Sequence, residues 1–130
     1  MSLKRNEETV RNFCAAWDEM DIDGITSLMS EEVVYHNLPV EPIIGLQQIT
    51  EFVEDFFQAA ESARFEVLTI VADAERVVTE RLDTFAFKDG SIMKELPVLG
   101  IFEFDDNGKI SAWREYWDVQ DWVKRGGPAL

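Results

Sequence analysis

The second half of the chain is a succession of strand patterns separated by turn signals, and this feature most constrains the fold. Four runs rich in Val, Ile, Phe and Thr span residues 65–72, 76–88, 92–104 and 110–119. The turns between them include Asp89-Gly90 and Asn107-Gly108, the dipeptides favoured in tight hairpins. Strands joined in this way pair with their sequence neighbours, so the pattern predicts an antiparallel meander.

The first half of the chain has helical periodicity. Between residues 4 and 20 one apolar stripe recurs at helical spacing, and it contains Phe13, Cys14 and Trp17. Asp23 is expected to cap a short second helix. A strand is predicted over residues 32–38, and a third helix is predicted from Gly45 to about residue 60.

Helices followed by hairpin-linked strands are typical of an α+β domain. The order is two helices, one strand, a third helix and four strands, with a last short helix over residues 119–125. We expect the helices to pack on one side of a curved sheet. With 130 residues, of which 46% are hydrophobic, the chain is predicted to form one domain over residues 1–130.

The charge balance argues against two classes of partner. The chain has 12 basic and 26 acidic residues and a net charge of -14, which repels phosphate backbones and anionic bilayers. The acidity is interpreted as a solubility property, with steering of a cationic ligand toward a cleft as the alternative. No apolar stretch approaches the length of a membrane span. We therefore expect no nucleic acid, no membrane insertion and a cytoplasmic location.

The sequence predicts no cofactor and no metal ion. Cys14 is the only cysteine and His36 is the only histidine, so no zinc ligand set can be completed, and no calcium-loop spacing occurs. Cys14 falls on the apolar stripe of the first helix, where a buried, inert thiol is the usual outcome.

Arg81 and Asp83 lie on the face of a strand that is otherwise built for burial. Because strand side chains alternate between faces, these two residues share one side with Val77, Phe85 and Phe87. Burying two charges costs several kcal/mol per ion unless they are paired and hydrogen-bonded. The pair is therefore either part of a polar site or an ion pair on a solvated face.

Two further polar groups are candidates for the same site. Tyr35 and Asn37 have the same parity on the first strand, so the phenol and the carboxamide point the same way and could hold one water molecule. Alternatively, Tyr35 packs in the core and Asn37 satisfies its hydroxyl. Asp118 follows the last strand, where it is either a functional carboxylate or the N-cap of the final helix, with Asp121 three residues later.

Taken together, these groups resemble a known family. The segments Tyr35-His36-Asn37, Glu80-Arg-Leu-Asp83 and Trp113-Arg-Glu-Tyr-Trp-Asp118 are similar in order and in element type to the limonene-1,2-epoxide hydrolase family. That family lies within the wider NTF2-like (SnoaL-like) superfamily, whose cone fold has a curved, mixed but mainly antiparallel sheet with three to four helices on its concave side. The similarity covers nearly the whole chain.

The resemblance implies hydrolysis of an epoxide to a vicinal diol in one step, without a covalent intermediate or a cofactor. Asp118 would be the general base on a water molecule that Tyr35 and Asn37 also hold. Asp83 would be the general acid that protonates the epoxide oxygen, with Arg81 between the two carboxylates. The resemblance also implies a homodimer. Two carboxylates with opposed roles need environments that separate their pKa values, which a shared guanidinium can supply.

The substrate implied is a small, lipophilic epoxide in an apolar pocket. The residues expected to line the pocket are Phe85, Leu96, Val98, Val67, Trp17, Met29 and Phe102. Two other functions stay open. One is a ketosteroid-isomerase-like or polyketide-cyclase-like enzyme that transfers a proton beside a carbonyl, and the other is a non-catalytic module that binds a small molecule.

Overall fold

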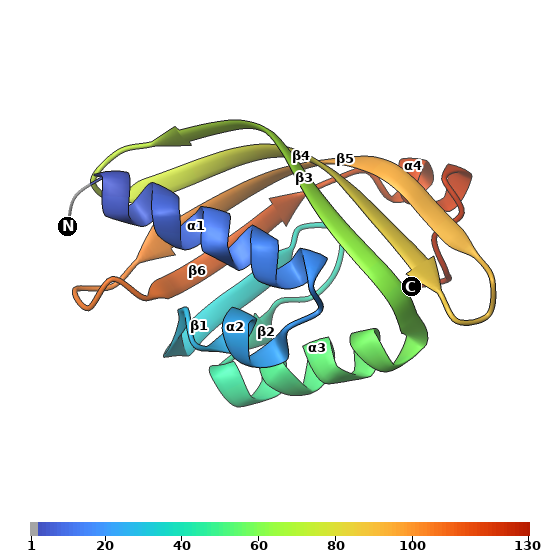
Figure 1. Ribbon diagram of the computed structural model, residues 1–130, viewed down its shortest axis with the longest axis horizontal. Helices are drawn as coiled ribbons and strands as arrows, with labels where there is room; N and C mark the ends of the chain where they lie inside the picture. The colour runs from blue at the N-terminus through green and yellow to red at the C-terminus, as the bar shows by residue number, and fades with distance from the viewer. Residues whose placement is uncertain (1–2) are drawn as a thin grey trace.

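The computed structural model describes residues 3–130 (Figure 1). In chain order the elements are α1 (Leu3–Asp18), α2 (Ile22–Thr26), β1 (Met29–Asn37), β2 (Ile43–Ile44), α3 (Leu46–Ala59), β3 (Ala60–Ala72), β4 (Arg76–Phe87), β5 (Ile92–Phe104), β6 (Ile110–Tyr116) and α4 (Val119–Lys124). None of these helices is long and apolar enough to cross a bilayer. The α+β class predicted from the sequence is confirmed.

Within residues 3–130 the strands form one six-stranded sheet in the order β2-β1-β6-β5-β4-β3. Strands β3 to β6 pair antiparallel with their sequence neighbours, so the predicted meander is confirmed. Strand β1 joins the meander by pairing parallel with β6, and β2 pairs antiparallel with β1. The parallel pairing places residues 35–37 beside residues 113–115.

Helices α1, α2 and α3 lie under the arch of the sheet (Figure 1). Helix α1 packs against β3 and β4, while α3 packs against β1 and β3. The predicted apolar stripe of α1 is buried, and the Phe13 ring meets the rings of Phe102 and Trp113 edge-on at centroid distances of 5.6 and 4.8 Å. Around Phe13, helix α1 thus fills one end of the concave face. The other end, beyond Trp17, is left for a cavity.

Several local features of the structure differ from the sequence-based expectation. Asp21, not Asp23, caps α2, because its carboxylate accepts from the Gly24 amide at 3.0 Å. Strand β3 begins at Ala60, five residues before the predicted start, since residues 60–64 are an edge segment whose polar side chains mask the strand pattern. Strand β2 has only two residues, which is too short for any periodicity to be read.

Candidate active site

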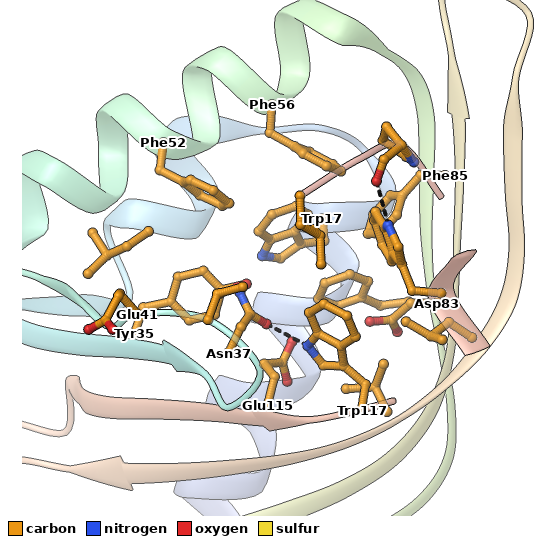
Figure 2. A pocket seen from close by; sticks show the side chains of 18 of the residues that line it. Trp17, Tyr35, Asn37, Glu41, Phe52, Phe56, Asp83, Phe85, Glu115 and Trp117 are labelled. Atoms are coloured by element: carbon orange, nitrogen blue, oxygen red, sulfur yellow. Dashed lines mark hydrogen bonds between the residues drawn. The ribbon is translucent and has the colours of Figure 1, made fainter. Parts of the chain in front are cut away.

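A cavity of about 270 Å³ opens between α3 and the concave face of the sheet (Figure 2). Helix α3 supplies Phe52 and Phe56 on one side. On the opposite side the sheet supplies Asp83 and Glu115, which are 4% and 3% exposed. An apolar chamber with carboxyl groups at its base has the general form of a small-molecule site.

Arg81 lies beneath these two carboxyl groups and connects them. It is 0% exposed. Its Nε and Nη2 donate to the two oxygens of Asp83 at 3.0 and 2.9 Å, and Nη2 also donates to Oε1 of Glu115 at 2.7 Å. Nη1 donates to the Thr79 hydroxyl at 3.1 Å, and the guanidinium lies 4.3 Å from the centroid of the Phe65 ring. The charge is therefore paired and hydrogen-bonded, as burial requires.

Gly100 makes room for this network. It stands between Thr79 on β4 and Glu115 on β6 in the register of the sheet. A Cβ at this position would lie 2.5 Å from Nη1 of Arg81 and 2.8 Å from Oε2 of Glu115. The guanidinium can lie directly against the sheet only because residue 100 has no side chain.

Burial dominates the electrostatics of the cluster. It raises the pKa of Asp83 and of Glu115, and Arg81 acts in the opposite direction on both. Burial alone would lower the pKa of Arg81, but the two carboxylates together raise it well above its usual value, so the guanidinium stays charged. Raised pKa values favour the protonated form of a carboxyl group, and acid catalysis requires a group that carries a proton.

Oε2 of Glu115 has no hydrogen-bond partner among residues 3–130. The nearby Trp113 indole slightly lowers the pKa of this carboxyl, as a weak donor would, but it does not reach hydrogen-bond geometry. Buried polar atoms are usually paired. Glu115 lines the cavity and, within the described residues, keeps one carboxyl oxygen without a partner, so its carboxyl group is a candidate for binding a water molecule or a ligand there.

Tyr35 and Asn37 stand next to Glu115. Trp117 Nε1 donates to Asn37 Oδ1 at 2.9 Å, and Asn37 Nδ2 donates to the Tyr35 hydroxyl at 2.7 Å. Figure 2 shows Asn37, Glu115 and Trp117 gathered at one edge of the cavity. Because the phenol oxygen already accepts from Asn37, its own proton is free to be donated to a molecule in the cavity. Burial raises the pKa of Tyr35, so it stays protonated.

Asp118 does not join the cluster, and its predicted place opposite Arg81 is wrong. It is exposed and caps α4, accepting from the Asp121 amide at 3.0 Å. Strand β6 ends at Tyr116, so its alternation does not extend to residue 118. Glu115 takes the position beside Arg81 instead. Strand parity could have identified it, because Glu115 shares the inward face with Trp113.

The structure places four of the seven predicted wall residues at the cavity. Trp17, Phe85, Leu96 and Val98 line the cavity. Three other predicted wall residues do not line the cavity: Val67, Met29 and Phe102. Phe102 is covered by Phe13 of α1, Met29 pairs with Ile110 in the core, and Val67 is half-buried at an irregularity in β3. Strand parity gives the inner face but not which part of that face a helix covers.

A model of the limonene-1,2-epoxide hydrolase catalytic domain matches residues 4–126. The chain belongs to the limonene-1,2-epoxide hydrolase family. It is 30% identical over 115 residues to epoxide hydrolase EphG of Mycobacterium tuberculosis, an alignment that covers 88% of this chain and 74% of that protein. The solved structure of a limonene-epoxide-hydrolase-like epoxide hydrolase from M. tuberculosis superposes with a TM-score of 0.85 at 27% identity, covering 95% of this chain and 90% of the other.

The fold extends beyond the limonene-1,2-epoxide hydrolase family. A crystal structure described as a polyketide cyclase from Xanthomonas campestris pv. campestris also superposes with a TM-score of 0.85, at 18% identity and with 95% and 97% of the two chains covered. These matches confirm the predicted NTF2-like, SnoaL-like fold. At that identity the second likeness concerns the fold alone, so the chemistry must be argued from the side chains at the site.

Proposed function

We propose that the chain hydrolyses a small lipophilic epoxide to a vicinal diol by general acid and base catalysis in one step. The observation that carries the proposal is the buried guanidinium of Arg81, which joins Asp83 and Glu115 at the base of an apolar cavity. Membership of the epoxide hydrolase family supports it. The epoxide and water are the only reactants required, so the proposal includes no cofactor.

Glu115 is assigned the role of general base. It pairs in register with Asn37, whereas Asp83 lies two strands away on β4. A water molecule held by Tyr35 and Asn37 would therefore stand beside Glu115, whose Oε2 is free to take its proton. The water oxygen would form a bond to one ring carbon of the epoxide as the bond between that carbon and the ring oxygen breaks.

Asp83 is assigned the role of general acid. Burial raises its pKa, so that it can carry a proton to the epoxide oxygen. After that transfer Asp83 is an anion, and the two hydrogen bonds from Arg81 stabilise it. One proton leaves the water for Glu115 and one leaves Asp83 for the diol, so the charges balance once the two carboxyl groups exchange a proton through solvent.

The experiment is diol formation from a panel of terpene, styrene and cycloalkene oxides. Asp83→Asn and Glu115→Gln should each lower kcat by roughly 10²–10⁴-fold, because each removes one proton-transfer step. Asp118→Asn is the matched control, since that residue is exposed and is assigned no catalytic role. Undiminished turnover in both Asp83→Asn and Glu115→Gln would refute the assignment. A large loss in Asp118→Asn would restore the sequence-based role of that residue.

The two alternative functions predict no diol in this assay and a different result in a second measurement. A ketosteroid-isomerase-like or polyketide-cyclase-like enzyme would form no diol but would exchange protons beside the carbonyl of a ketone ligand. A non-catalytic module would retain an apolar ligand without either reaction. A cytoplasmic location stays a prediction from the sequence.

We also propose a homodimer formed through the outer face of the sheet. This face carries apolar side chains that the fold leaves exposed, among them Leu99 and Tyr116 at 43% and 42% exposure. The ion pair between Arg114 and Glu103 lies on the same face. An apolar surface rimmed by polar groups is typical of a protein interface.

A further inference from the structure

The cavity has an unusual balance of charge for a site that takes a neutral substrate. Among residues 3–130, the ionisable side chains that line it include Glu41, Asp83 and Glu115, and no lysine, arginine or histidine lines it. Arg81 lies beneath the carboxyl groups and is fully buried. A ligand in the cavity therefore meets carboxyl oxygens and no basic side chain.

The remaining wall offers aromatic faces. Trp17, Tyr35, Phe52, Phe56 and Trp117 all line the cavity, and Figure 2 shows their rings arranged around it. The negative face of an aromatic ring attracts a cation, most strongly when the cation is desolvated. Aromatic rings combined with a carboxylate are the groups that recognise an alkylated ammonium ion.

An oxygen of Glu115 that is unpaired among the described residues adds a third observation to the acidic lining and the aromatic wall. Oε2 of Glu115 is buried, lacks a hydrogen-bond partner among residues 3–130 and belongs to a residue that lines the cavity. Two ionised carboxyl groups beside one guanidinium leave one negative charge unbalanced. A proton on Asp83 can balance it, and so can a cation bound in the cavity.

We propose that the cavity binds lipophilic ammonium ions, with the charged nitrogen beside Glu115 and the alkyl or aryl groups against the aromatic wall. The net charge of -14 would attract such a cation toward the cavity from a distance. This ligand class goes beyond the neutral epoxide of the proposed function. Because the ammonium ion would occupy the same space, it would compete with an epoxide substrate.

The test compares two ligands of the same shape, phenyltrimethylammonium and tert-butylbenzene, which differ in a charged nitrogen and a carbon. Binding is measured by the fluorescence of Trp17, Trp117 and Trp122, which line the cavity. The wild-type protein should bind the cation at least about tenfold more tightly than the hydrocarbon. Equal affinities, or tighter binding of the hydrocarbon, would overturn the proposal without any variant being needed.

Two variants test whether the preference for the cation depends on the carboxyl group of Glu115. Glu115→Gln should reduce the affinity for phenyltrimethylammonium by about tenfold or more and leave that for tert-butylbenzene unchanged. Glu8→Gln makes the same change of charge at an exposed position of α1 that does not line the cavity, and should change neither affinity. An equal loss in both variants would mean that only the overall charge attracts the cation, and the site would be refuted. If Glu115→Gln does not fold, Asp83→Asn takes its place.

The result is independent of catalysis. Binding is measured without turnover. If the protein prefers the cation but forms no diol, the proposed hydrolase function is refuted and the ammonium site is still supported. Conversely, diol formation that phenyltrimethylammonium does not inhibit at millimolar concentration would refute the ammonium site and leave the hydrolase intact.

Discussion

Gly100 determines whether Arg81 can be buried at all. A Cβ added at residue 100 would approach Nη1 of Arg81 and Oε2 of Glu115 to 2.5 and 2.8 Å, which is closer than side-chain atoms tolerate. The sequence alone shows only a glycine within a strand, which usually weakens the strand. The structure shows that this glycine is needed because the guanidinium of Arg81, from the neighbouring strand β4, lies against it.

Gly100→Ala should therefore destabilise the protein and lower its activity together. Overpacking a buried site costs about 1–3 kcal/mol, and here it would also displace Arg81 from the two carboxyl groups. Urea denaturation and the rate of diol formation are the measurements. Lys94→Ala, at an exposed position of β5, is the control and should change both little. A Gly100→Ala protein with wild-type stability and rate would mean that the network tolerates a shift at its base.

The boundary between β6 and α4 decides which carboxyl group reaches the site. Strand β6 places Trp113 and Glu115 inward, and the chain then leaves the sheet, so Asp118 turns to the start of α4. The sequence correctly indicated both elements and offered the N-cap as one interpretation of Asp118. The family resemblance favoured the other interpretation, and strand geometry decided against it.

Asp118→Ala should affect stability and not catalysis. Loss of an N-cap costs about 0.5–2 kcal/mol, and α4 carries the buried Trp122 against the cavity. We expect a lower urea midpoint, with kcat within about twofold of wild type. Gln120→Ala, at an exposed site in the same helix, controls for helix propensity. Unchanged stability with a loss of turnover as large as that of Glu115→Gln would contradict the cap assignment.

At the scale of the whole molecule, helices α1, α2 and α3 cover the concave face of the sheet (Figure 1). Leu99 and Tyr116 are exposed on the opposite face because their inward neighbours, such as Val98 and Glu115, take the concave side. A sheet face with apolar side chains is commonly buried by a second copy in a two-fold interface. The high negative charge of each chain opposes this contact and is screened at physiological salt.

Sedimentation at micromolar concentration and about 150 mM salt should therefore give about twice the chain mass of 14.9 kDa. Leu99→Glu should shift the protein to a monomer, because it places a charge in the apolar contact. Leu38→Glu makes the same change outside the sheet face and should remain dimeric. A wild-type monomer under these conditions would refute the dimer.

The sequence by itself determined the elements and their faces. Alternation along 77–87 placed Arg81 and Asp83 on one face with Val77 and Phe85, and helical spacing placed Trp17 on the apolar stripe of its helix, because both patterns depend only on local backbone geometry. Only the tertiary structure decided that Arg81 meets Glu115, which is 34 residues away and two strands across the sheet. The physical reason is that alternation sets the face of a side chain, whereas its neighbours across the sheet depend on strand order, register and the point at which each strand ends.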